Sequence, residues 1–155
     1  MRLALYQPDI PQNTGTILRM AACLGVAADI IQPTGFDISD RSLKRAGLDY
    51  LAHVDMTRHA SWQMFELWRS RAGSPRLVLL TVDAQVSHLE HGFRASDIIL
   101  LGRESAGVPE PVHQAADARI RVPMQPGLRS LNVAVTAAIV LGEALRQTGG
   151  FPAQT

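Results

Sequence analysis

The sequence is poor in cysteine and lacks an apolar run long enough for a membrane span, and each shortage excludes a class of protein. Cys23 is the only cysteine among the 155 residues, so an intrachain disulfide is impossible and a reducing compartment is favoured. The apolar helical pattern of residues 131–146 is shorter than the about 20 residues that cross a bilayer. Residues 1–6 lead directly into a strand-like run, without the apolar segment of a secretory signal. We therefore expect a cytoplasmic protein.

Lysine is also nearly absent, and the net charge of +1 is too small to indicate a nucleic-acid-binding protein by itself. Of the 15 basic residues, 14 are arginine and only Lys44 is lysine. Arginine makes bidentate contacts with phosphate, although a GC-rich genome would produce the same bias. Arg41, Lys44 and Arg45 lie close together in the sequence, around an expected loop and short helix. They predict a local basic surface.

What is present is a hydrophobic content of 46%, arranged as alternating strand-like and helix-like segments. Residues 76–82 and 97–101 are nearly continuous apolar runs, which are typical of parallel strands covered on both faces. The predicted class is α/β, with a mostly parallel sheet flanked by helices in a single domain of residues 1–155. We expect strands at residues 2–6, 28–31, 50–54, 76–82, 97–101 and 120–122, and helices ending near residues 24, 46, 71 and 146, with a short helix after Pro109.

Several helix ends have recognisable capping residues. Asn13 or Thr14 is predicted to cap the first helix, and Gly25 suits the position after its end. Ser61 is predicted to cap the helix that ends near residue 71. Trp62, Phe65 and Trp68 recur at helical spacing there and are expected to face the core.

Three loops that follow expected strands contain most of the unusual glycines and polar residues. They are residues 7–15, 102–107 and 123–130, and Leu80 ends a fourth strand. Open α/β sheets bind ligands beyond the carboxyl ends of their strands. We therefore expect these loops to converge on one site.

Other motifs do not carry a function. Gly102 and Gly107 have the glycine spacing of a P-loop, but Val108 and Pro109 follow in place of lysine and a hydroxyl residue. No Gly-x-Gly-x-x-Gly is present, and Arg103 occupies the first glycine position of a nucleophile elbow. His88 and His91 lack an evident third metal ligand, so we expect solvated loop histidines and no metal site. Cys23 is expected to be buried in its apolar helix.

Three motifs together resemble those of the SPOUT, or trefoil-knotted, RNA methyltransferases. They are Asn13 to Arg19, Leu101 to Pro109, and Ile120 to Met124 combined with Arg129 to Asn132. Residues 45–50 and 57–59 are similar to those of the small TrmL type within that family, which methylates the ribose 2′-hydroxyl of cytidine or uridine 34 of tRNA. The resemblance covers nearly the whole chain and implies a C-terminal knot, with no extra RNA-binding domain.

The resemblance also implies S-adenosylmethionine as cofactor, held by backbone groups of Leu80, Gly102, Val122 and Ser130 with Leu101, Met124 and Leu131 as the adjacent wall. The glycine allows close backbone approach, and the apolar side chains suit an adenine ring, although plain core packing explains such side chains equally well. No metal is implied.

By the same resemblance Arg19 is the catalytic residue. Arginine almost never loses its proton, so we expect it to orient a phosphate or the 2′-hydroxyl. The residues assigned to substrate RNA, in the anticodon stem-loop of tRNA, are Asn13, Glu104 and Arg129, together with Arg41, Lys44 and Arg45 from the local basic surface. Glu104 also fits a contact with the ligand amine or an ordinary loop carboxylate.

The helix expected at residues 131–146 is apolar on every side, so it must be covered on more than one side. Its own sheet and a second copy of the chain are the predicted partners, which makes a homodimer. Two alternatives stay open for function: the same methylation at another tRNA or rRNA position, and a non-catalytic RNA- or nucleotide-binding α/β module.

Overall fold

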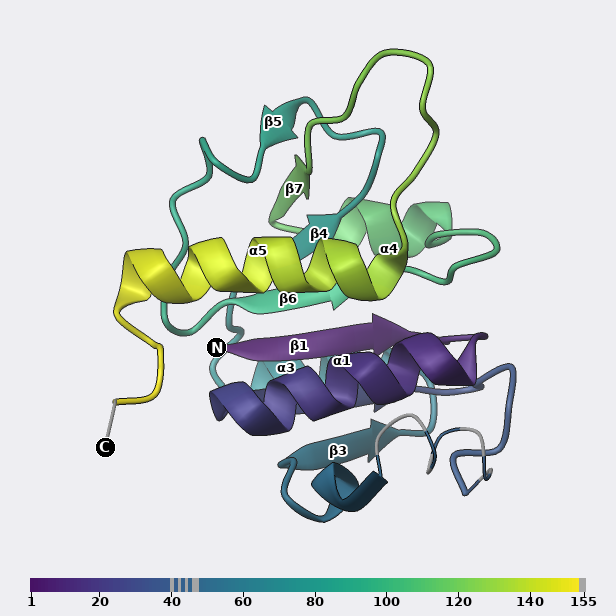
Figure 1. Cartoon of the computed structure of the whole chain (residues 1–155). Helices are drawn as coiled ribbons and strands as arrows, with labels where there is room; N and C mark the ends of the chain where they lie inside the picture. Colours follow the sequence, from purple (N-terminus) through teal and green to yellow (C-terminus); the bar gives the residue numbers. More distant parts are fainter. Residues whose placement is uncertain (40, 42, 44, 46–47, 154–155) are drawn as a thin grey trace.

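Within the residues that the computed structural model describes, 1–39, 41, 43, 45 and 48–153, a seven-stranded parallel sheet forms the centre of the molecule (Figure 1). The strand order is β3-β2-β1-β6-β4-β7-β5, and every pair is parallel. The predicted α/β class is therefore confirmed. The strands are β1 (Arg2–Tyr6), β2 (Ala27–Ile31), β3 (Met56–His59), β4 (Leu77–Leu80), β5 (Val86–Ser87), β6 (Ile98–Leu101) and β7 (Ala118–Arg121).

Helices cover both faces of the sheet, as the continuous apolar strands predict. The helices are α1 (Pro11–Leu24), α3 (Trp62–Arg71), α4 (Glu110–Ala115), α5 (Val133–Thr148) and the 3₁₀-helix η1 (Leu48–Ala52). Successive residues of β6 point to opposite faces: Ile99 and Leu101 join the core beneath α1 and α5, whereas Ile98 and Leu100 join the core beneath α3 and α4. In Figure 1, α1 and α5 lie side by side over one face, and they are in contact.

The first helix begins earlier than its polar residues predict. Ile10 is the residue before the helix, and Pro11 occupies its first turn, where a missing N–H costs nothing. Asn13 and Thr14 therefore lie inside α1, and the prediction that one of them caps it is wrong. The C-terminal prediction is confirmed, because Gly25 ends the helix with φ 66°. Cys23 is exposed on this helix, so its expected burial is wrong as well.

The predicted strand at residues 50–54 is also wrong. Residues 48–52 form η1, which packs against α1, and the strand of this region is β3 at residues 56–59. Leu51 and Val54 are partly buried against the core beneath α1. The apolar side chains that suggested a strand are thus used in packing against a helix.

The α3 predictions are confirmed. The hydroxyl of Ser61 accepts a hydrogen bond from the N–H of Met64 at the start of the helix. Phe65 is fully buried, and Trp62 and Trp68 pack beside it on the same core.

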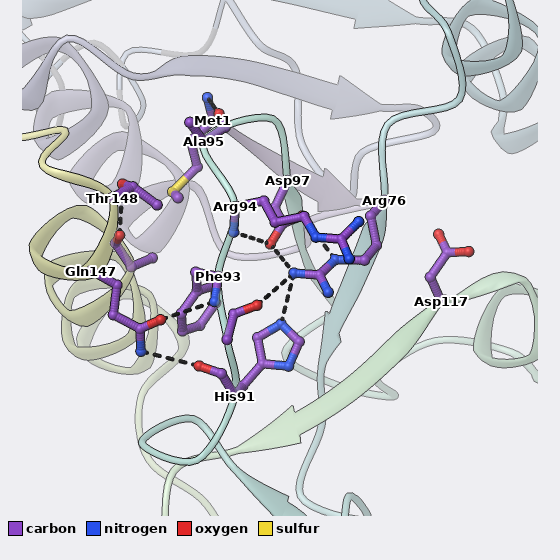
Figure 2. A network of polar contacts seen from close by, with 12 residues as sticks. Met1, Arg76, His91, Phe93, Arg94, Ala95, Asp97, Asp117, Gln147 and Thr148 are labelled. Atoms are coloured by element: carbon purple, nitrogen blue, oxygen red, sulfur yellow. Dashed lines mark hydrogen bonds and ion pairs between the residues drawn. The ribbon is translucent and has the colours of Figure 1, made fainter.

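A polar network fastens the chain between β4 and β6 to the end of α5 (Figure 2). The side-chain oxygen of Gln147 accepts from the Phe93 N–H at 2.9 Å, and its NH₂ donates to the His91 carbonyl at 3.0 Å. In the same network, Arg76 pairs with the buried carboxylate of Asp97 at 2.7 Å. The network lies at the amino end of β6, opposite the edge where the loops predicted to form a site leave the sheet.

The short strand β5 in this connection was not predicted, because two residues are too few to show a pattern. His88 follows it, and its N–H donates to the Arg121 carbonyl at 2.9 Å. His88 is only 5% exposed, so the expectation of a solvated histidine is wrong at that position.

The described part of the chain covers α5 on one side only. Ala137, Val140 and Leu141 are buried against the sheet, as predicted, whereas Val135 and Ile139 are 49% and 39% exposed. Among the described residues, no helix has the length and apolarity needed to cross a membrane.

Candidate active site

The carboxyl ends of β1, β6, β4 and β7 open into a cavity of about 570 Å³. Its walls come from the loops after these strands and from the first turns of α1 and α5. The convergence predicted from the loops is therefore observed. All the residues that the resemblance implies for the cofactor line this one cavity: Leu80, Leu101, Gly102, Val122, Met124, Ser130 and Leu131.

The loop after β6 is closed by its own backbone. The N–H of Arg103 donates to the carbonyl of Gly107, and the N–H of Gly107 donates to the carbonyl of Arg103, both at 2.9 Å. A Cβ at Gly102 would lie 2.8 Å from the carbonyl carbon of Gly107. Because no side chain fits there, glycine is required at position 102 for this tight wall of the cavity.

Two carboxylates meet where the loops after β1 and β6 touch. The N–H of Asp9 donates to Glu104 Oε2 at 3.1 Å, and the N–H of Glu104 donates to Asp9 Oδ1 at 3.2 Å. The Ser105 hydroxyl also donates to Asp9 Oδ2. Glu104 lines the cavity, whereas Asp9 does not.

The two carboxyl groups have pKa values shifted in opposite directions. Hydrogen bonding to Glu104 and Ser105 lowers the pKa of Asp9 to about 2. Burial raises the pKa of Glu104, and the contact with Asp9 raises it further. Two carboxylates in contact do not both ionise freely, so Asp9 carries the charge at neutral pH and Glu104 takes up a proton more readily than an ordinary glutamate. Sequence reasoning missed Asp9, which has no motif of its own.

Asn13 connects these carboxylates to α5. Its side-chain NH₂ donates to Glu104 Oε1 at 3.5 Å, and its carbonyl oxygen accepts from Asn132 at 2.9 Å. Asn132 in turn caps α5 by accepting from the N–H of Ala134 at 2.8 Å. Asn13 and Glu104, both predicted at the site, therefore belong to one hydrogen-bonded chain along the cavity.

The loop after β7 carries a second, smaller cavity of about 290 Å³, which shares Val122 and Met124 with the first. Arg129 lines it and is exposed. Thr81, Asp83 and His113 line the main cavity but were not predicted, because they follow a strand or lie in a short helix without a recognisable motif.

Arg19 does not lie at the cavity within this chain. It is exposed on α1, with its guanidinium over the ring of Tyr50 at 4.6 Å from the centroid. Arg19 makes no hydrogen bond or ion pair with any residue that the structure describes. A ring beneath the guanidinium plane leaves the N–H groups at its edge available to another molecule.

The predicted basic surface is described only in part. Arg41 and Arg45 are exposed, and Lys44 lies outside the described residues. Among the described side chains, no three His, Cys, Asp or Glu residues gather where they could hold a metal ion.

Comparison with known proteins shows which family the chain belongs to. The model of the SpoU rRNA Methylase family matches residues 1–142. The chain belongs to this family. A tRNA (cytidine(34)-2′-O)-methyltransferase of Beijerinckia indica is 60% identical over 149 residues, which are 96% of this chain and 92% of that protein.

Solved structures agree with this family on the fold. A structure described as giving insights into the 2-OH methylation of C/U34 on tRNA matches with a TM-score of 0.89 and 42% identity, covering 94% of each chain. An rRNA methyltransferase from Sinorhizobium meliloti with bound AdoMet matches with a TM-score of 0.85 and 28% identity, covering 94% of this chain and 55% of that one.

Proposed function

We propose that this SpoU methylase transfers a methyl group from S-adenosylmethionine to the ribose 2′-hydroxyl of nucleotide 34, cytidine or uridine, in tRNA. The observation that carries the proposal is the gathering of all seven residues implied for the cofactor around one cavity, in a chain that is 60% identical to a tRNA (cytidine(34)-2′-O)-methyltransferase. The AdoMet bound to the related rRNA methyltransferase supports the choice of donor.

The cavity fits such a donor. Its volume of about 570 Å³ lies in the range of small-molecule sites. Leu80, Val122 and Met124 provide apolar surface for a flat ring, while the backbone beside Gly102 and Ser130 supplies polar groups. Glu104 places a carboxylate on the wall for a positively charged ligand. The donor, when bound, supplies a methyl carbon activated by a positively charged sulfur.

Arg19 acts on the acceptor nucleotide in this proposal. It stays protonated, so it fixes a phosphate or the 2′-hydroxyl, and the hydroxyl proton passes to a phosphate or to water. Alignment of two reactants can lower a barrier by several kcal/mol. Because Arg19 lies outside the cavity of its own chain, the proposal requires that a second copy carry it to the site.

A homodimer through α5 meets that requirement. Val135 and Ile139 form an exposed apolar stripe on the side of α5 away from the sheet, and Leu131 at the cavity mouth is exposed beside it. Such a stripe next to an incomplete site fits a second copy. Ala138 lies in the middle of the stripe, so Ala138→Glu is expected to yield monomers or insoluble protein. A soluble, active dimer of that variant, measured by light scattering, would refute the interface.

The substrate contacts belong to the same proposal. Arg129 lines the smaller, neighbouring cavity, and Arg41 and Arg45 are exposed, which suits contact with phosphates of an anticodon stem-loop. Lys44 is assigned with them from the sequence alone. We also propose the trefoil knot, the single-domain organisation and the cytoplasmic location that the sequence indicates.

The test is transfer of labelled methyl groups from S-adenosylmethionine to unmodified tRNA, followed by mapping of the methylated nucleotide. We expect label at nucleotide 34. Arg19→Ala should lower kcat by about 10²-fold while donor binding persists, which is the size of effect seen when one transition-state contact is removed. Arg71→Ala, an exposed helical arginine on the opposite face, is the matched control. Label at another position would replace the proposed target, and donor binding without any transfer would refute the enzyme.

A further inference from the structure

Asp9 touches three consecutive residues of the loop that forms one wall of the cavity, yet it is not part of that wall. Its Oδ1 accepts from the Glu104 N–H, its Oδ2 accepts from the Ser105 hydroxyl, and the Arg103 guanidinium lies 3.9 Å from Oδ2. The Asp9 N–H returns a bond to Glu104 at 3.1 Å.

Asp9 is itself held from behind. The N–H of Gly35, in the loop after β2, donates to the Pro8 carbonyl at 2.9 Å. A Cβ at Gly35 would lie 2.9 Å from the Cα of Asp9, so the two backbones approach each other closely. The contact between the loops after β1 and β2 therefore fixes the position of Asp9, independently of its bonds to the loop after β6.

The contacts of Asp9 extend along the cavity through Glu104. Glu104 accepts from Asn13 of α1, and Asn13 accepts from Asn132 at the start of α5. Glu104, Asn13 and Asn132 all line the cavity. A displacement of Glu104 would thus be passed to two helices as well as to its own loop.

We propose that Asp9 is a positioning residue for methyl transfer, which holds residues 103–105 in the conformation that binds the donor and directs Glu104 toward the cavity. This inference rests on the proposed function, because it assigns the cavity to the donor. Asp9 does not contact the donor; it acts through Glu104 and the backbone of the loop. The depressed pKa of Asp9 agrees with this assignment, since the ionised carboxylate accepts the bonds that the loop donates.

The first test needs no donor. The Gly107 amide bonds to Arg103 within the loop and does not touch Asp9, so its hydrogen exchange reports the shape of the loop. Asp9→Ala is expected to accelerate that exchange by about tenfold or more, the effect of losing one to two hydrogen bonds to a charged group. Asp9→Asn keeps an acceptor for the Glu104 N–H and should restore most of the protection. Asp55→Ala removes an exposed carboxylate elsewhere and is the matched control.

The second test measures the dissociation constant of S-adenosylmethionine by calorimetry, with the melting temperature recorded for each variant. Asp9→Ala should bind the donor about tenfold more weakly, Ser105→Ala less so, and Asp9→Asn within about threefold of the natural chain. A purely structural role would lower the melting temperature without separating Asn from Ala in donor affinity.

The outcomes separate the two proposals. If the natural chain does not bind the donor, the proposed function fails, while the exchange of Gly107 still decides whether Asp9 positions the loop. If the donor binds and Asp9→Ala leaves its affinity or the exchange of Gly107 unchanged, the role of Asp9 is overturned. Should Asp9→Ala fail to fold, the same two measurements are made on Ser105→Ala and Asp9→Asn. If both variants then give the values of the natural chain, the inference is wrong.

Discussion

The carboxylates at the two ends of the parallel sheet have opposite surroundings. At the amino end of β6, Asp97 is completely buried and accepts two bonds from Arg76, at 2.9 and 2.7 Å, and one from the Arg94 N–H at 2.9 Å (Figure 2). At the carboxyl end of β6, Asp9 and Glu104 face each other, and the Arg103 guanidinium lies 3.9 Å from Asp9 Oδ2. One end is neutralised and closed, whereas the other holds paired acids beside a cavity.

The ion pair at the amino end stabilises the fold, whereas the paired acids at the carboxyl end belong to the candidate site. The hydrogen-bonded ion pair with Asp97 raises the pKa of Arg76 and so favours its charged form, which suits a permanent link. The paired acids instead leave Glu104 with a raised pKa, so its charge responds to whatever enters the cavity. Perturbed acids beside a cavity are typical of functional sites. The geometry thus separates two kinds of acidic residue that the sequence presents alike.

The largest expected effect is a loss of stability when the ion pair at the amino end of β6 is removed. Asp97→Ala would leave Arg76 without its partner in a partly buried position, and the unfolding free energy should fall by about 3 kcal/mol or more. Urea unfolding measures this loss, with Asp55→Ala as a control in which an exposed carboxylate is removed. Donor affinity of the folded fraction should remain unchanged. A loss below about 1 kcal/mol would mean that Asp97 does not stabilise this end.

A smaller effect on stability and a larger one on binding are expected at the open end from Gly102→Ala. The added methyl group would press on the backbone of Gly107 and distort the cavity wall, so donor affinity should fall by at least about tenfold, or ~1.4 kcal/mol. Gly142→Ala in α5 is the matched control, because a Cβ there meets no atom within 4 Å. That variant should bind the donor normally and melt slightly higher. Equal donor affinity in both variants would contradict the tight wall.

Much of this architecture could be predicted because its signals are local. Continuous apolar runs at residues 76–82 and 97–101 predicted buried parallel strands, and β4 and β6 lie within them. Glycines and prolines after the strands predicted loops at one edge, and those loops line the cavity. Local patterns failed where packing decides: the apolar residues 50–54 pack as η1 and the turn after it against α1, not as a strand.

The contact between Asp9 and Glu104 lay beyond prediction for a different reason. The two residues are 95 positions apart, and they meet because β1 and β6 are neighbours in the sheet. Alternation of strands and helices does not reveal strand order, so no pattern in one sequence pairs these acids. Arg19 shows the same limit, since its motif indicated a role while its exposed position on α1 depends on tertiary packing.

The smallest expected effect is on the pH dependence of stability at the carboxyl end of the sheet, where Glu104 and Asp9 meet. The folded-state pKa of Glu104 is raised above its ordinary value, so its contribution to stability is complete at low pH and is lost as pH rises through the folded-state pKa. Asp9 behaves in the opposite sense, because its contribution is lost only as pH falls toward about 2.

Glu104→Gln cannot ionise, so between pH 5 and 8 its melting temperature should decline less than that of the natural chain, by about 1–3 °C. Parallel melting curves for the natural chain and Glu104→Gln across pH 5–8 would show that Glu104 does not titrate in this range, and the distinction between the two ends of the sheet would be lost.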